Sequence, residues 1–292
     1  MSPKKLIRKL GLNLNQIKDE GIVRIIEKGD LIPKIIHQTY FKKELSPEIK
    51  LNIEKLKEAN PDWEFRFYDD NDIEAYIKNN FPEILNIYNK INTKYGAARA
   101  DLFRYLVVYK DGGVYLDIKS SLSKPLSEIL KPNDQYILAH WDFTHNPYCR
   151  HASLNNPNGE FQQWHIISTK GHPFLKAVIE NICKNIKVYN VYLHDVGKMG
   201  VLNLTGPIAY TLAILPILHL HKHRVGFDKD FGLIYSVFAN SLGGHRMLFK
   251  THYEGLKESI VNQSMIGKLL FPFFCKLKET AKKRIFSLDK FS

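Results

Sequence analysis

The sequence has few cysteines, no long hydrophobic run and fewer acidic than basic residues. The three cysteines among 292 residues, Cys149, Cys183 and Cys275, match no metal-ligand spacing, which indicates free thiols in a reducing compartment. No apolar run near the N-terminus is long enough for a signal peptide. The most apolar stretch, residues 210–220, is interrupted by Pro216 and is shorter than the roughly 20 residues of a membrane span. These absences predict a cytoplasmic protein.

The excess of 42 basic over 30 acidic residues gives a net charge of +12. A basic surface attracts phosphate groups, whether in nucleic acid, in anionic lipids or in a phosphorylated substrate. A generally lysine-rich proteome explains the charge equally well. Nucleic-acid binding is the weakest of these alternatives, because the chain contains neither a zinc-finger spacing nor an RNA-recognition aromatic motif.

Strand and helix patterns alternate along the chain, which predicts an α/β fold with one large domain. Residues 1–30 read as a polar, amphipathic helical segment, residues 31–258 as a catalytic domain and residues 259–292 as a basic, aromatic tail. Residues 161–168 fit either a strand or the start of a helix. The remaining patterns predict strands over 32–40, 63–68, 114–116 and 135–139, and helices over 47–58, 73–79, 97–109 and 173–186.

Three charged residues lie close together in the sequence around a helix, a turn and a strand. Asp101 and Arg104 are spaced i, i+3, so they share one face of a largely apolar helix. Burying a charge is costly unless it is paired or bound to a ligand, and a simple Asp–Arg ion pair explains these two residues as well. Gly112-Gly113 ends the helix, and a short strand then delivers Asp117, as α/β enzymes do at a ligand crevice.

The segment AARADLFRYLVVYKDGGVYLDIK, residues 97–119, resembles the sugar-transfer signature of glycosyltransferase family 32. Four other segments resemble parts of that family in the expected order, between about Ile32 and Tyr253. They read IPKIIHQTY, PDWEFRFYDDND, GEFQQWHIISTKGHPFLKAVIENI and LTGPIAYTLAI.

The resemblance implies a glycosyltransferase-A fold, a single Rossmann-like α/β domain with helical additions. It further implies retaining transfer of a hexose from a UDP- or GDP-linked sugar to a glycan or lipid-linked acceptor. Family members of this kind build surface polysaccharides such as capsule and lipopolysaccharide. A catalytically inactive sugar-binding relative is the alternative.

Carried over by position, the resemblance implies catalytic roles for three residues. Asp101 would bond donor sugar hydroxyls, Arg104 would reach the sugar or the diphosphate, and Asp117 would be the first acid of the DXD motif. We expect Asp101→Ala and Asp117→Ala to abolish transfer while leaving thermal stability nearly intact. The donor-binding set also includes His37, Gln38, Thr39, Tyr115 and Lys119, and the acceptor side includes Gln163 and Trp164.

The DXD motif departs from the family at its second acid, because the chain reads Asp117-Ile118-Lys119. That acid normally binds Mn²⁺ or Mg²⁺, and a charged lysine cannot. Lys119 either replaces the metal by neutralising the diphosphate itself, or points elsewhere while Asp117 and a later ligand such as His252 hold the metal. The family pattern favours the second interpretation.

The remaining candidate sites are a group of histidines and the C-terminal tail. His219 and His223 would share a face if residues 219–223 were helical, but no carboxylate or cysteine accompanies them, which favours a solvated turn. The tail predicts an interfacial helix on the inner face of the cell membrane, and a helix packed on the domain is its alternative. It places Leu269, Leu270, Phe271, Phe273 and Phe274 beside Lys276, Lys278, Lys282, Lys283 and Arg284.

Overall fold

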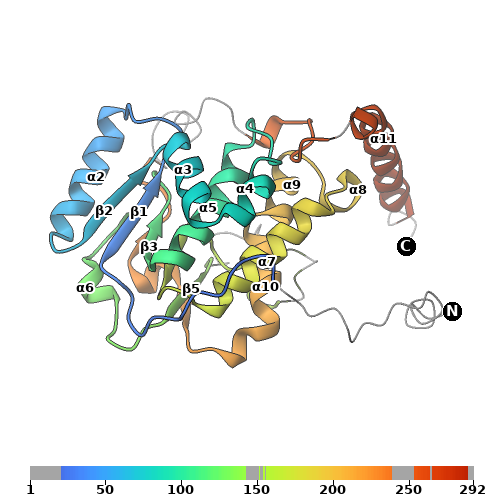
Figure 1. Cartoon of the computed structure of the whole chain (residues 1–292). Coiled ribbons are helices and arrows are strands. Elements are labelled where there is room, and N and C mark those ends of the chain that lie inside the picture. The colour runs from blue at the N-terminus through green and yellow to red at the C-terminus, as the bar shows by residue number, and fades with distance from the viewer. Residues whose placement is uncertain are drawn as a thin grey trace.

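A six-stranded mixed sheet forms the centre of the computed structural model, which describes residues 21–142, 151, 154, 156–238, 253–263 and 265–288 (Figure 1). Its strand order is β2-β1-β3-β6-β5-β7, and of these six strands β6 alone runs opposite to its neighbours. A small second sheet pairs β4 with β8. The strands are β1 Ile35–Thr39, β2 Glu64–Tyr68, β3 Gly113–Leu116, β4 Ser121–Leu122, β5 Tyr136–His140, β6 His165–Ser168, β7 Arg224–Phe227 and β8 Leu233–Ile234.

Helices cover both faces of the large sheet. One hydrophobic core lies against α5 and its neighbouring helices, and a second lies on the opposite face under α2 and α6. The α-helices are α2 Pro47–Ala59, α3 Asp70–Asn80, α4 Pro82–Tyr88, α5 Gly96–Asp111, α6 Leu126–Ile129, α7 Pro173–Lys187, α8 Val191–His194, α9 Gly197–Leu204, α10 Pro207–Ile214 and α11 Met265–Leu288. Short 3₁₀ helices are η3 Leu215–Leu220, η4 Asp228–Phe231 and η6 Tyr253–Gly255.

Local sequence signals explain where several of these elements begin. Ser46 caps α2 with its side chain ahead of a proline in the first turn. Asp69 and Asp72 form a capping box at the start of α3, each accepting a backbone hydrogen bond. The strands and helices predicted between residues 32 and 186 are found within a few residues of their expected bounds, and residues 161–168 contain strand β6.

The turn between α5 and β3 depends on two glycines with positive φ. Gly112 has φ 72° and Gly113 has φ 97°, a region that side chains with a Cβ rarely adopt. A Cβ on Gly113 would lie 2.5 Å from the carbonyl oxygen of Ile35 on β1. The glycines thus allow β3 to leave α5 abruptly and to approach β1 closely.

The described part of the predicted N-terminal helix, residues 21–30, contains no helix. It runs across the domain as an irregular segment, seen as the darkest blue trace in Figure 1. The backbone amide of Val23 donates to Glu180 Oε1 at 2.9 Å, and that of Ile26 donates to the Tyr109 hydroxyl at 3.1 Å. Distant side chains satisfy this backbone, so helix formation is not needed there. Residues 1–20 lie outside the described residues.

Within the described residues, the segment 197–220 has the length and composition of a membrane span, and its most apolar 18-residue window has a mean hydropathy of 1.7. It is not one continuous helix, because α9, α10 and η3 divide it at Thr205-Gly206 and at Leu215. Within that window, 56% of the residues are buried inside the protein. Its apolar character is therefore accounted for by packing in the core.

Candidate functional site

Asp117 follows the carboxyl end of β3, beside the carboxyl end of the parallel strand β1. Parallel neighbours place their carboxyl ends at one edge of a sheet, so Thr39 and Asp117 come together there. Tyr115 donates to Asp117 Oδ1 at 3.4 Å, and its hydroxyl is 2.9 Å from Thr39 Oγ1. Thr39, Tyr115 and Asp117, all predicted to bind the donor, therefore form one connected group.

Arg104 projects from α5 between the two predicted catalytic carboxylates. Its Nη2 lies 3.2 Å from Asp101 Oδ1 and 3.0 Å from Asp117 Oδ1, and its side chain is 5% exposed. The guanidinium also lies 4.7 Å from the centroid of the Tyr115 ring. Burial opposes the charged guanidinium, but both carboxylates raise the pKa of Arg104, which stays protonated. The structure thus brings together Asp101, Arg104 and Asp117, and their catalytic roles stay predictions.

Asp101 is held deeper than Asp117. Thr205 donates to its Oδ2 at 2.9 Å, and Gln163 donates to its Oδ1 at 3.2 Å, so both oxygens have partners. The residue is 2% exposed, and burial raises the pKa of Asp101 despite the nearby Arg104. In this arrangement Asp101 positions Arg104, and its contact with a donor sugar stays a prediction.

Gln163 belongs to the same network, although it was expected on the acceptor side. Arg104 Nη1 donates to its side-chain and backbone oxygens, each at 2.8 Å. The antiparallel direction of β6 explains this position, because the start of β6 meets the end of β3. Trp164 is buried and packs against Tyr235, with ring centroids 5.6 Å apart. An acceptor role for Gln163 and Trp164 stays a prediction.

Lys119 reaches the second oxygen of Asp117. Its Nζ lies 2.8 Å from Asp117 Oδ2, and its side chain is 9% exposed. Burial opposes both charges, but Arg104 and Lys119 together lower the pKa of Asp117, and Asp117 in turn raises the pKa of Lys119. The carboxylate and the ammonium therefore remain charged. At 17% exposure, Asp117 is the most exposed side chain of the four charged residues.

Tyr235 is a site residue that sequence patterns did not indicate. The Lys119 ammonium lies 4.5 Å from the centroid of its ring, a cation–π contact. Ser120 Oγ donates to the carbonyl of Tyr235 at 2.8 Å, at the end of the β4–β8 pair where β4 begins and β8 ends. Tyr235 is more than 110 residues away from Lys119 in the sequence, so no local spacing could have identified it.

The side chains around Asp117 do not fit a divalent metal. Metal ligands must offer lone pairs, but Arg104 and Lys119 already donate to the two oxygens of Asp117. The part of the chain that the structure describes contains no group of three or more His, Cys, Asp or Glu residues that could hold a metal ion. His252, the predicted second ligand, lies outside the described residues.

His37 and Gln38, both on strand β1, are buried in different surroundings. His37 Nε2 donates to the Gly112 carbonyl at 3.0 Å, and its Nδ1 accepts from the Tyr68 hydroxyl at 3.1 Å. Burial lowers the pKa of His37 to about 4, so the ring is neutral and links β1 to the α5–β3 turn. Gln38 donates to the Asp117 carbonyl at 3.3 Å, and its buried Oε1 has no partner among the described residues. Donor contacts of both residues stay predictions.

The histidines near residue 220 do not form the helical face that their spacing allows. His219 lies in η3, whereas His221 and His223 follow after this helix has ended. His221 and His223 instead pack with their rings 5.7 and 5.6 Å from that of Phe174. The three histidines therefore do not share a helical face, as their spacing alone would have allowed.

The segment that contains the charged cluster is similar to parts of known proteins. Residues 46–137, which include Asp101, Arg104, Asp117 and Lys119, match the model of the "glycosyltransferase sugar-binding region containing DXD motif". A stretch of 182 residues is 34% identical to mannosyl phosphorylinositol ceramide synthase of Saccharomyces cerevisiae and covers 62% of this chain and 41% of that protein. A stretch of 153 residues is 31% identical to inositol phosphoceramide mannosyltransferase 3 of Schizosaccharomyces pombe and covers 52% of this chain and 37% of that protein. The aligned region thus spans less than half of either relative.

The fold agrees with this sequence match. The structure superposes on the UDP-bound glycosyltransferase domain from the YGT toxin with a TM-score of 0.50 and 8% identity, covering 73% of this chain and 82% of that one. Both have a mixed α/β sheet with helices, the glycosyltransferase-A type that the resemblance implied. Residues 46–137 therefore resemble the sugar-binding region of the glycosyltransferases with a DXD motif, and the fold around them is of the glycosyltransferase-A type.

Proposed function

We propose that the protein transfers a hexose, with mannose as the first candidate, from a UDP- or GDP-linked sugar to a glycan or lipid-linked acceptor. The observation that carries this proposal is the Asp101–Arg104–Asp117 cluster at the carboxyl edge of β1 and β3, inside the sugar-binding region of the family. The names of the two fungal relatives support mannose and a lipid acceptor. Synthesis of a cell-surface glycan, with retention of configuration, completes the proposal.

The chemistry follows from where the charges lie. When a nucleotide diphosphate leaves the sugar, negative charge develops on the leaving oxygen and must be stabilised. The Arg104 side chain is 4–5% exposed and pairs with the more exposed Asp117. It is therefore a fixed cation at the edge where a donor would bind. Because Asp101, Gln163 and Asp117 all bond Arg104, the guanidinium needs little reorganisation when that charge appears.

A donor panel tests the proposal. We expect the purified chain to bind and slowly hydrolyse one member of a set of UDP- and GDP-hexoses that includes a mannosyl donor, measured by calorimetry and by release of the free nucleotide. Binding without turnover in the presence of acceptor lipids or glycans would identify an inactive sugar-binding relative. Absence of binding to every donor, together with salt-sensitive binding to random DNA, would contradict the proposal and favour the nucleic-acid alternative.

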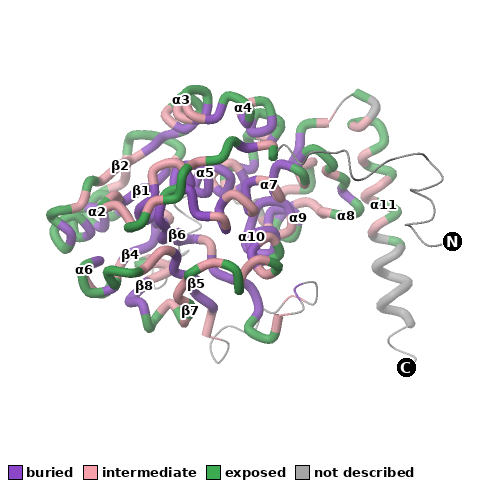
Figure 2. The backbone as a smooth tube through the Cα atoms, turned by 60° about the horizontal axis from the view of Figure 1, so that its bottom comes forward, coloured by how far each residue is buried: buried purple, intermediate pink, exposed green. Residues whose placement is uncertain are grey.

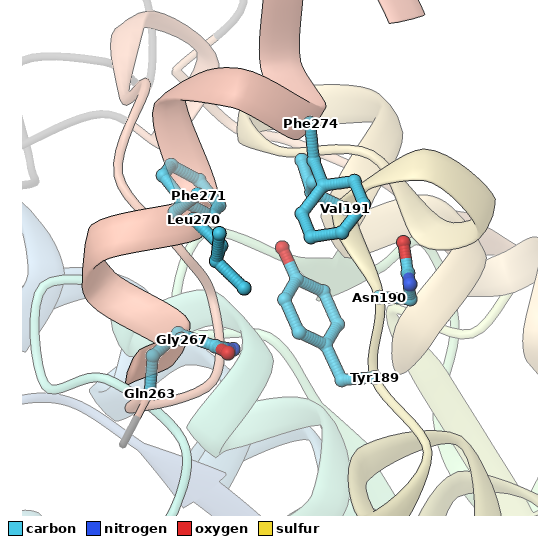
Figure 3. Close-up of a pocket in the computed structure, with 8 residues that line it drawn as sticks. All are labelled: Tyr189, Asn190, Val191, Gln263, Gly267, Leu270, Phe271 and Phe274. Atoms are coloured by element: carbon cyan, nitrogen blue, oxygen red, sulfur yellow. The ribbon is translucent and has the colours of Figure 1, made fainter. Parts of the chain in front are cut away.

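We further propose that α11 holds the enzyme on an anionic membrane, where a lipid-linked acceptor resides. One face of α11 packs on the domain: Lys278 lies 3.0 Å from Asp195, and Phe271 and Phe274 face Tyr189 across a cavity of about 290 Å³ (Figure 3). The helix stands at the end of the molecule that is far from α2 (Figure 1). Among the described side chains of α11, those of Phe271, Phe274 and Lys278 thus form the inner face that packs on the domain.

The outer face of α11 carries an apolar stripe. Four apolar side chains spaced four residues apart form this stripe, namely Met265, Leu269, Phe273 and Leu277. They are 89%, 80%, 59% and 45% exposed, and exposed residues are green in the N-terminal part of α11 in Figure 2. Lys268 and Lys276 are exposed beside the stripe. Apolar side chains flanked by lysines match the boundary between acyl chains and anionic headgroups, which favours a bilayer over a purely apolar partner.

Co-sedimentation with vesicles checks the membrane proposal. We expect the full chain to bind vesicles of phosphatidylcholine with 30 mol % phosphatidylglycerol and to bind pure phosphatidylcholine vesicles much less. The double variant Leu269→Ser/Phe273→Ser should reduce binding at least about tenfold, since each buried side chain contributes roughly 1.5–3 kcal/mol. Leu51→Ser is the control, because Leu51 is an exposed leucine on α2. Equal binding by the double variant and the control would contradict the proposal.

A further inference from the structure

Position 119 carries a charge two units more positive than the family motif provides. Asp101, Arg104, Asp117 and Lys119 form a connected group of two carboxylates and two cations, with a net formal charge of zero. An aspartate at position 119, as the DXD motif of the matched family has, would give a net charge of −2. One divalent cation added to that acidic group would also bring it to zero. The lysine therefore makes the same change in charge as a bound metal.

The geometry places the lysine charge where a metal would have to bind. Lys119 Nζ lies 2.8 Å from Asp117 Oδ2, on the oxygen that Arg104 does not use. The ammonium is further fixed by the Tyr235 ring at 4.5 Å, and the backbone of Lys119 accepts a 3.0 Å hydrogen bond from Val237. An ammonium has three N–H donors, and the contact with Asp117 uses one of them, so others are available to phosphate oxygens.

We propose that this enzyme binds its nucleotide-diphosphate donor without a divalent metal, because the Lys119 ammonium occupies the metal position and neutralises the diphosphate together with Arg104. This inference rests on the proposed function, because it assumes a donor with a diphosphate. A fixed ammonium cannot exchange with solvent ions, so donor binding should be insensitive to chelators. Asp117 then serves to hold the two cations and does not act as a metal ligand.

Calorimetric titration of the full chain with UDP and with GDP, in EDTA and in Mn²⁺, tests the proposal. We expect the wild type to bind the preferred nucleotide equally, within about twofold, in both buffers. Lys119→Ala should bind about 10- to 100-fold more weakly in either buffer, because a charge-assisted contact is lost. Lys119→Asp, which recreates the two acids of the motif, should bind only when Mn²⁺ is present. Lys119→Arg should stay within about tenfold of the wild type.

Lys34→Ala is the matched control, since it removes a lysine that also pairs with an aspartate, Asp62, at the opposite end of β1. Thermal melts establish that each variant is folded; if Lys119→Ala is not, Lys119→Gln provides the neutral side chain. Wild-type binding that disappears in EDTA overturns the inference and leaves the proposed function intact. Wild-type affinity in a folded neutral variant, or a Lys119→Asp variant that ignores both EDTA and Mn²⁺, also overturns it. Failure of both nucleotides to bind the wild type in either buffer contradicts the proposed function itself.

Discussion

Replacing Arg104 by methionine is expected to lower the free energy of unfolding by about 3–5 kcal/mol and to reduce kcat/KM at least about 100-fold. The stability loss follows because Asp101 would remain buried without its cation, in a pocket closed by Thr205 and Gln163. The activity loss follows because the fixed positive charge at the edge of β3 disappears. Urea unfolding measures the first effect, and sugar transfer with the donor identified in the panel measures the second.

Arg99→Met in the same helix is the control for this prediction. Arg99 lies over the Tyr88 ring at 4.1 Å and donates to the Ile91 carbonyl, so its removal should cost about 1 kcal/mol and leave transfer unchanged. An Arg104→Met protein as stable as Arg99→Met would show that the buried pairs contribute no net stability. Wild-type transfer by Arg104→Met would remove Arg104 from the catalytic machinery.

The same reasoning changes the expectation for the two carboxylates. From the sequence, Asp101→Ala and Asp117→Ala were expected to abolish transfer with little effect on stability. The structure buries Asp101 and partly buries Asp117 beside the buried Arg104, so each alanine would leave that cation with one fewer partner. Loss of stability in these variants is therefore compatible with a catalytic role, and it does not by itself indicate a purely structural one.

Gly113→Ala is expected to lower the free energy of unfolding by about 2–4 kcal/mol, because a Cβ would lie 2.5 Å from the Ile35 carbonyl oxygen at a strained φ of 97°. The clash is with backbone, so β3 must move away from β1 and carry Asp117 with it. A displacement of about 1 Å at a reacting group can cost about 100-fold in rate. We therefore expect a loss of that order in kcat, measured well below the melting temperature.

Gly96→Ala tests whether the effect is specific to the turn. Gly96 begins α5, and nothing lies within 4 Å of a Cβ built on it. An alanine at this position should leave activity unchanged and increase stability by about 0.4–1 kcal/mol. If Gly113→Ala behaved like Gly96→Ala, close spacing between β1 and β3 would not be what positions the site.

Local sequence signals were sufficient for α5, its glycine turn and the acid that follows β3. Periodicity and the glycine pair act over a few neighbouring positions, so the helix, the turn and the strand could be predicted, and the family resemblance then singled out Asp101, Arg104 and Asp117. The N-terminal segment could not be predicted in this way, because the side chains that satisfy its backbone, those of Tyr109 and Glu180, come from α5 and α7. Only the folded chain brings these partners to it.

The roles of Gln163 and Tyr235 depended on strand direction and long-range pairing. Gln163 joins Arg104 because β6 runs antiparallel to β3, which no local pattern specifies. Tyr235 reaches Lys119 through the β4–β8 pair, and the residues of that pair are more than 100 positions apart. The sequence likewise left open whether Lys119 pointed toward or away from Asp117, and the ion pair at 2.8 Å is what favours metal-free donor binding.

The bond between Thr205 and Asp101 has a consequence for the order of events during synthesis. The two residues are 104 positions apart, so at about 5–20 residues per second Asp101 is synthesised roughly 5–20 s before its hydroxyl partner. During that interval α5 contains a carboxylate whose buried setting is incomplete. The apolar surface of α5 can thus be fully covered only after α9 and α10 have been synthesised. The domain therefore reaches its final packing late in translation.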